Sequence, residues 1–192
     1  MLNLMRGEEG LSEIFAAVKR DDIHVVDMSG KCFMWNDDSK LWEECAKEHI
    51  VSCIATTLEQ VIMKEIGLEL AGDKNDKHLK WLKRIRDRVL NYAACNAVMK
   101  MALPKLLSKD FESQLNCNPD LFPIQQGCVV DLKHGTARER LREDMFSFEC
   151  PVYWSASDEG YDTVDRFMLS IANDDVAVKE MLQKQLGYFL TG

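Results

Sequence analysis

Basic side chains are concentrated in one stretch of an otherwise acidic sequence. The chain has 192 residues and a formal net charge of −8 at pH 7. Residues 74–109, in contrast, hold ten basic residues against two acidic ones, a local net charge of +8. Lysine and arginine bind phosphate without reading base identity, and each neutralised phosphate releases condensed counterions. The chemistry that this stretch could perform is the binding of a polyanion such as the backbone of DNA.

Helical spacing gives these charges a common face. We predict one helix over residues 76–103, in which apolar residues about 100° apart gather on one side and Pro104 ends or kinks the helix. The opposite side is basic, and two interpretations stay open for it. It binds a phosphate backbone, or it is a solvated face or one that pairs with acidic residues of a neighbouring subunit. The candidate contacts to nucleic acid are Lys77, Lys80, Lys83, Arg84 and Arg88.

Arginine also recurs at alternate positions later in the chain. If the segment that holds them is extended, Arg138, Arg140 and Arg142 point to one face, because successive side chains of a strand alternate between its two faces. Arg138 and Arg140 are therefore the second candidate set for nucleic-acid contact. The alternative is a solvent-exposed face with acidic residues nearby.

Two β-hairpins are predicted among the elements that position these side chains. In residues 31–44, two aromatic segments containing Trp35 and Trp42 flank a turn-forming stretch. Their rings could stack on bases, or they could pack in the core. The second hairpin pairs the apolar run at residues 128–130 with residues 136–140.

The remaining segments have helical periodicity, and together with the hairpins they predict an α+β fold that is mainly α-helical. We expect a helical domain with β-hairpins over residues 1–154. A polar stretch then leads into a C-terminal helical segment over residues 155–192. The other predicted helices cover residues 10–20, 43–70, 161–172 and a last segment that follows a capping cluster at 173–175.

No catalytic or metal-binding constellation is recognisable in the sequence. It has no G-x-x-x-x-G-K-[ST] phosphate-binding loop, no H-E-x-x-H and no C-x-x-C, and its four histidines are isolated from one another. We therefore predict no catalytic residue, no metal ligand and no cofactor in this chain. Seven scattered cysteines favour reduced thiols in an intracellular protein, and no apolar run approaches the ~18 residues of a membrane span.

One ordered set of residues resembles a known family. It lies within residues 121–148, and the closing sequence LGYFLTG extends the resemblance, which covers the chain from about residue 31 to residue 192. The set resembles the accessory domain of poxvirus-type primase-helicases and of their phage and plasmid relatives, which precedes a superfamily 3 helicase motor. It consists of Pro123, Gly127, the apolar triplet before Asp131 and Leu132, the turn glycine Gly135, and then Arg138, Arg140 and Asp144.

The resemblance implies a role in viral DNA replication. The parent would be a ring-forming, hexameric hydrolase with helicase and primase activities, whose motor binds ATP and Mg²⁺. This domain would link primase to motor and contact DNA, with no membrane partner, at replication sites in the host cytoplasm or nucleus. The alternative is an oligomerisation or scaffold module of the ring that does not touch DNA.

Overall fold

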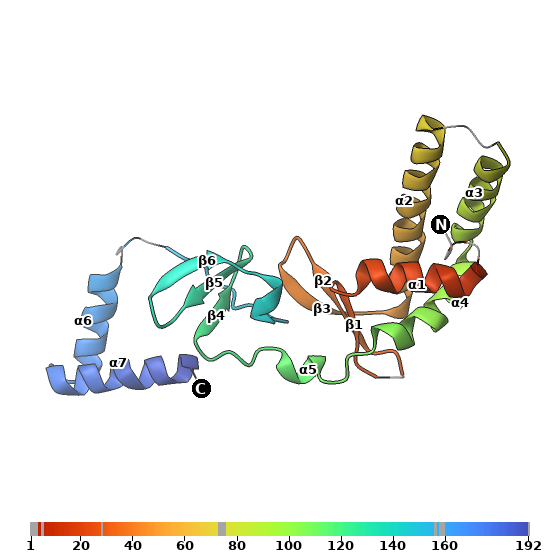
Figure 1. The fold of residues 1–192 in the computed structure, drawn as a ribbon. Helices are drawn as coiled ribbons and strands as arrows, with labels where there is room; N and C mark the ends of the chain where they lie inside the picture. Colours follow the sequence, from red (N-terminus) through yellow and green to blue (C-terminus); the bar gives the residue numbers. More distant parts are fainter. Residues whose placement is uncertain are drawn as a thin grey trace. The chain divides into compact units, whose positions relative to one another are not determined.

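The computed structural model describes Leu4 and residues 6–27, 29–72, 76–155, 157 and 160–191 (Figure 1). These residues form seven α-helices and two three-stranded sheets, which confirms the predicted α+β, mainly helical class. Two compact units are present. The first comprises Met1–Trp35 and Glu43–Ser113, and the second comprises Asn36–Trp42 and Gln114–Gly192. The division at residue 154 stays a prediction about how the parent is organised.

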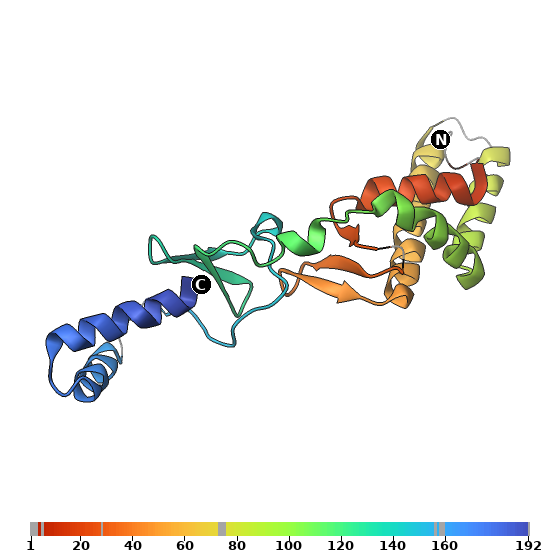
Figure 2. The ribbon, with the colours of Figure 1, turned by 90° about the horizontal axis from the view of Figure 1, so that it is seen from below.

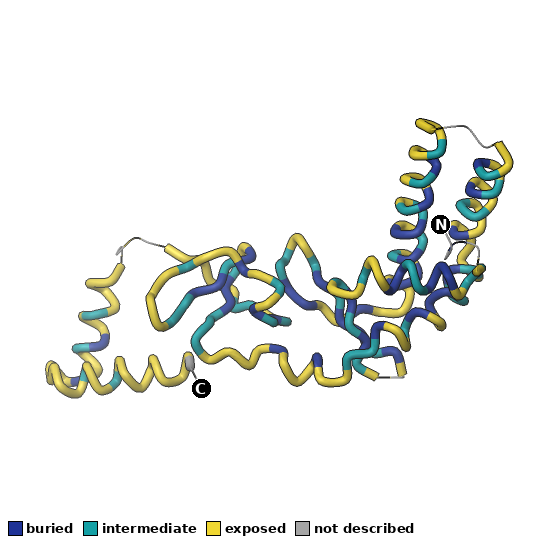
Figure 3. The backbone as a smooth tube through the Cα atoms, in the orientation of Figure 1, coloured by how far each residue is buried: buried dark blue, intermediate teal, exposed yellow. Residues whose placement is uncertain are grey.

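Helices supply most of the first unit. They are α1 (Gly7–Lys19), α2 (Lys47–Ala71), α3 (Asp76–Val89) and α4 (Tyr92–Ala102), followed by the 3₁₀ turn η2 (Leu103–Leu106) and the short α5 (Phe111–Gln114). Helix α1 lies along α4 (Figure 2), and α2 packs on α3. The buried residues of α2 and α3 lie on the sides of these two helices that face each other (Figure 3). They form one apolar core with α1, in which Phe15, Ile54, Leu58, Ile62 and Leu82 have no exposed surface.

The single helix predicted over residues 76–103 is wrong, because two helices meet at residues 90–91. Asn91 adopts an extended conformation, and its side-chain oxygen accepts hydrogen bonds from the amides of Ala93 (2.9 Å) and Ala94 (3.4 Å). Such an asparagine cap begins a new helix by satisfying donors that have no partner within the helix. The apolar periodicity continues across the break and therefore concealed it.

A small antiparallel sheet completes the first unit. Its strands are β1 (Ile23–Val25), β2 (Cys32–Asn36) and β3 (Leu41–Cys45), in the order β1-β2-β3. The predicted first hairpin is confirmed as β2 and β3, and its tip, Asn36–Trp42, belongs to the second unit. The predicted helix at residue 43 begins later, at Lys47, because residues 41–45 form the strand.

The second unit contains the other sheet. Strands β5 (Cys128–Asp131) and β6 (Thr136–Glu139) confirm the predicted hairpin, and β4 (Leu121–Ile124) pairs with the other side of β5. Strand β4, which was not predicted, contains Pro123. Proline is tolerated there because β4 is an edge strand.

The two tryptophans of the first hairpin lie in the interior. Trp35 and Trp42 are 8% and 2% exposed. The indole Nε1 of Trp42 donates to the carbonyl oxygen of Arg142 at 3.1 Å. Of the two fates left open for these rings, the structure shows core packing.

Two helices end the second unit. Helix α6 (Tyr161–Ile171) is followed by α7 (Val176–Thr191), which is capped by the Asp175 carboxylate through the amides of Ala177 and Val178. The capping role predicted for residues 173–175 is thus confirmed at Asp175. Among the helices that the structure describes, none combines the length and apolar character that crossing a bilayer requires.

Candidate nucleic-acid interface

One face of α3 carries a row of exposed positive charges, which we call the α3 basic face. It consists of Lys77, Lys80, Lys83 and Arg84, with Arg88 at its C-terminal end. For the first four, the structure shows no hydrogen bond or ion pair with any other described residue. Their charges are therefore available to an external anion.

Packing of α3 fixes the direction of this face. Leu79, Leu82 and Val89 are buried in the core of the first unit, with 9%, 0% and 1% exposure. Because residues three and four apart share a side of a helix, the basic residues between them must face solvent. The predicted separation of an apolar and a basic side is confirmed for residues 76–89.

Two arginines of α3 are paired within the first unit. Arg86 bonds to Glu59 of α2 through Nε (2.9 Å) and Nη2 (2.8 Å). Arg88 pairs with Glu8 of α1 but keeps 54% of its side chain exposed. An exposed pair of this kind contributes little stability, so Arg88 can exchange Glu8 for a phosphate at small cost.

The prediction of nucleic-acid contact is wrong for Arg140. Its side chain has no exposed surface, and a guanidinium enclosed in this way cannot meet a phosphate. Strand β6 ends at Glu139, so the alternation that should have turned Arg140 outward does not extend to it. Arg140 instead bonds to Glu149 at 2.8 Å and to several backbone carbonyls.

Arg138 is also held by its own unit. Its two terminal nitrogens bond to the two carboxylate oxygens of Asp144 at 2.8 and 2.6 Å. Asp144 accepts a further bond from the amide of Leu141 at 2.8 Å. Burial raises the pKa of Asp144, but the bonds from Arg138 and Leu141 outweigh burial and hold the pKa below its usual value. We therefore leave Arg138 and Arg140 out of the interface.

This pairing makes a pH-dependent contribution to stability. A carboxyl group whose pKa is lowered by folding stabilises the fold above its unfolded pKa, and this stabilisation is lost as pH falls through the folded pKa. We expect Asp144→Asn to cost about 2 kcal/mol at neutral pH. The difference from the unmodified chain should shrink below about pH 4. Urea unfolding from pH 7 to pH 2.5 measures this difference, and a difference independent of pH would contradict the assignment.

Metal-binding side chains are not gathered at any point in the described residues. No three histidine, cysteine, aspartate or glutamate side chains lie close enough to hold a metal ion there. The cysteines are free thiols. The α3 basic face is thus the candidate functional site. It can neutralise the negative charges of a bound anion.

The fold and this surface define a mainly helical α+β domain that carries a basic helix face. The chain belongs to the family described as D5 N terminal like, whose model matches residues 12–183. This family is the N-terminal domain of poxvirus D5 and of phage and plasmid primase-helicase type proteins. The resemblance seen in the sequence is therefore confirmed, and the family places the domain in a DNA replication context. A search of curated proteins gives no match.

Proposed function

We propose that this domain links the primase to the superfamily 3 ATPase motor of one polypeptide and contacts DNA through the α3 basic face. Family membership supports the primase-helicase context. The observation that carries DNA contact is a row of exposed cations, of which Arg88 alone has an ion-pair partner among the described residues, in a chain of net charge −8. Outside residues 74–109 the net charge is negative, so a polyanion is attracted chiefly to the stretch that contains this row.

The length of the row suits a nucleic-acid backbone. Lys77, Lys80, Arg84 and Arg88 follow one another at intervals of three and four residues, which keeps them on one side of α3. At 1.5 Å per residue they span roughly 16 Å along the helix axis. Phosphates of one strand recur every ~3.4 Å along duplex DNA. The row can therefore neutralise several phosphates without reading the sequence.

The other activities of the parent belong to the same proposal. ATP and Mg²⁺ would bind the motor domain, whose hydrolysis of ATP in a hexameric ring would drive strand separation. The setting would be viral DNA replication in the cytoplasm or nucleus of a host cell. DNA binding at increasing salt, by chains with and without charge reversal on the α3 basic face, tests the contribution assigned to this domain.

The α6–α7 pair favours a second candidate function, that of an assembly module. Helices α6 and α7 contact each other, and their one buried apolar side chain among the described residues is Met168, next to the buried Ala172 that follows α6. The other large apolar residues of the pair are mostly exposed, which is unusual for a surface that meets only water. They include Tyr161, Val164, Phe167, Ile171, Met181, Leu186, Tyr188 and Phe189.

Self-association through this surface is open to test. If copies of the chain meet there, changing both Phe167 and Phe189 to serine should weaken association at least about tenfold, because each buried aromatic ring contributes a large apolar area. Sedimentation equilibrium over a range of concentrations measures the association constant. Glu180→Ser, an exposed change on α7, is the matched control. An unmodified chain that stays monomeric throughout the range would contradict the assembly function.

A further inference from the structure

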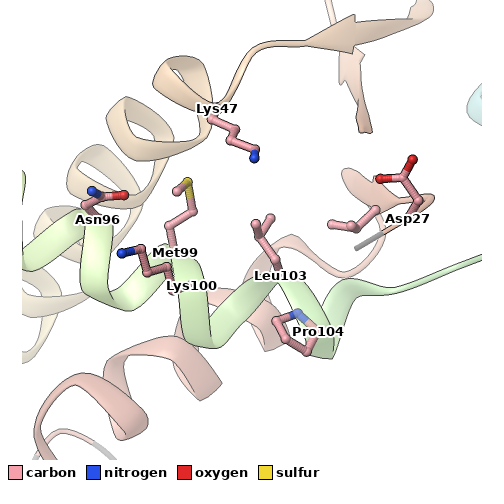
Figure 4. Close-up of a pocket in the computed structure, with 8 residues that line it drawn as sticks. Asp27, Lys47, Asn96, Met99, Lys100, Leu103 and Pro104 are labelled. Carbon is pink, nitrogen blue, oxygen red and sulfur yellow. The ribbon is translucent and has the colours of Figure 1, made fainter. Parts of the chain in front are cut away.

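A pocket of about 350 Å³ lies in the first unit (Figure 4), and its lining residues do not include those of the α3 basic face. Its apolar lining comes from β1, α4 and η2 and consists of Val25, Met99, Leu103 and Pro104. The wall at Val25 is fixed, since the Val25 carbonyl accepts a hydrogen bond from the amide of Ser108 at 2.7 Å. The pocket is therefore built by packed elements and has an aliphatic floor.

Two lysines from different helices meet the rim of this pocket. Lys47 is the first residue of α2, and Lys100 belongs to α4, where it lies beside Asn96 in Figure 4. Within the described part of the chain, none of the three side chains has a hydrogen bond or ion pair. The α2 N-cap residue, Ala46, provides no side-chain cap. The positive end of the helix dipole therefore adds to the charge of Lys47.

Gly30 helps to place Lys47 at the rim. A Cβ atom on Gly30 would collide with Cε of Lys47, so the lysine stem occupies the space that this glycine leaves open. Gly30 has φ +92°, a conformation that favours glycine. The loop between β1 and β2 and the start of α2 are thus matched to each other, which fixes the stem of Lys47.

Asp27 gives the rim a fixed negative group. Its Oδ1 accepts bonds from Ser29 Oγ (2.6 Å) and from the amides of Gly30 (3.0 Å) and Lys31 (3.1 Å). The bond from Ser29 is the largest cause of a pKa below the usual value for Asp27. The carboxylate therefore stays ionised at neutral pH. Figure 4 places it across the pocket from Asn96 and Lys100, so the rim is electrically polarised.

We propose that this pocket binds a short acidic segment of a partner protein. An aliphatic side chain of the segment would lie on the floor, and flanking carboxylates would pair with Lys47 and Lys100. Asn96 would bond to the peptide backbone, and Asp27 would direct the carboxylates toward the lysines by repulsion. The volume is near the lower end of the usual range of about 300–1,000 Å³ for ligand pockets, which suits one or two side chains.

The lining distinguishes an acidic peptide from a nucleotide. Bases bound without sequence preference usually stack on aromatic rings, and none of the described residues that line the pocket is aromatic. An aliphatic floor that contains a flexible methionine instead adapts to an aliphatic side chain. The two lysine ammonium groups would bind a phosphate or a carboxylate equally well. The aliphatic floor therefore decides between a nucleotide and an acidic peptide.

Titration of the 192-residue chain with a fluorescein-labelled peptide, Asp-Glu-Leu-Leu-Glu-Asp, tests this inference by anisotropy and by the methyl NMR signal of Met99. We expect binding that shifts the Met99 signal. Lys47→Glu together with Lys100→Glu should weaken binding by about tenfold or more, since both reverse charges that face the ligand. The double variant Lys64→Glu and Lys105→Glu, at exposed positions outside this pocket, is the matched control and should bind normally.

Four results would overturn the inference, the last of them obtained with a changed peptide. The first is no binding of the peptide. The second is equal weakening by the control pair, which would show attraction by net charge alone. The third is binding of dAMP or of an oligonucleotide that depends on Lys47 and Lys100 and excludes the peptide, which would make this a nucleotide site. A peptide with both leucines changed to serine should lose binding, and retained binding would exclude a role for the floor. Charge reversal on α3 leaves the pocket unchanged, so the DNA proposal can fail independently.

Discussion

Arg140→Met is expected to destabilise the second unit by about 3–5 kcal/mol, because removing one partner of a buried ion pair leaves the other charge uncompensated. The partner is Glu149, 2.8 Å from Nη2 of Arg140. Nη2 also donates to the carbonyl oxygens of Ile124 and Cys128. These carbonyls flank the β4–β5 turn, so the loss falls on the sheet itself.

The other terminal nitrogen of Arg140 holds the tip of the first hairpin. Nη1 donates to the carbonyl oxygens of Ser39 (3.3 Å) and Lys40 (3.4 Å). One side chain thus joins the 36–42 segment to the sheet of the same unit. Hydrogen exchange of amides in β4–β6 is the direct measurement, and the expected loss corresponds to exchange roughly 150- to 5,000-fold faster.

Two further variants distinguish the cost of leaving a buried charge unpaired from the cost of losing hydrogen bonds and packing. Arg142→Met lies two residues away, where the guanidinium approaches the exposed Asp37 at 3.6 Å, and should change stability by less than about 0.5 kcal/mol. Arg140→Met combined with Glu149→Met should recover part of the loss, because no unpaired charge remains. A double variant as unstable as the single one would show that the carbonyl contacts, not the charge pair, dominate.

Sequence patterns predicted the structure correctly where a single helix or hairpin fixes the positions of the side chains. The β5–β6 hairpin followed from an apolar run and a turn ending at Gly135, where φ is +64°. The two sides of α3 followed from helical spacing alone. Both inferences depend on neighbours in sequence, and local periodicity reports these directly.

Sequence patterns gave a wrong structure where the position of a side chain depends on the residue at which a helix or strand ends. Periodicity assigns a side chain to a face only while the element continues, and β6 ends one residue before Arg140. Strand β4 was missed because Pro123 breaks the local signal, although an edge position tolerates it. The partners of Arg140 on the hairpin tip are about 100 residues away in the chain. The pocket at Lys47 likewise joins side chains from three separate segments, near residues 25–27, at residue 47 and over residues 96–104. No local pattern contains such contacts.

Reversing three charges of the α3 basic face should abolish most of the DNA affinity assigned to this domain. In the variant with Lys77, Lys80 and Arg84 changed to glutamate, we expect affinity for a fluorescent oligonucleotide to fall at least about 100-fold at low salt. All three side chains are exposed and have no ion pair among the described residues. The change therefore removes phosphate contacts and leaves the buried side of α3 intact, which circular dichroism can verify.

The salt dependence identifies the contacts more sharply than the affinity does. Each phosphate neutralised contributes about −0.9 to the slope of log K against log salt for duplex DNA and about −0.7 for single strands. Loss of three contacts should therefore make the slope less steep by about 2 to 3. The same titration with duplex and with single-stranded DNA compares the two affinities, and the form that binds more tightly is the one that the domain holds.

A control with the same change in net charge decides whether position matters. Lys100, Lys105 and Lys109 are exposed in the same unit but lie outside α3. Changing them to glutamate should weaken binding only through the long-range field, which salt screens within about 10 Å at 0.1 M. Equal losses in the two triple variants at that salt concentration would contradict a localised interface. If reversal on α3 spares DNA binding but prevents self-association, the face meets acidic residues of another copy. The assembly function would then replace the DNA-contact proposal.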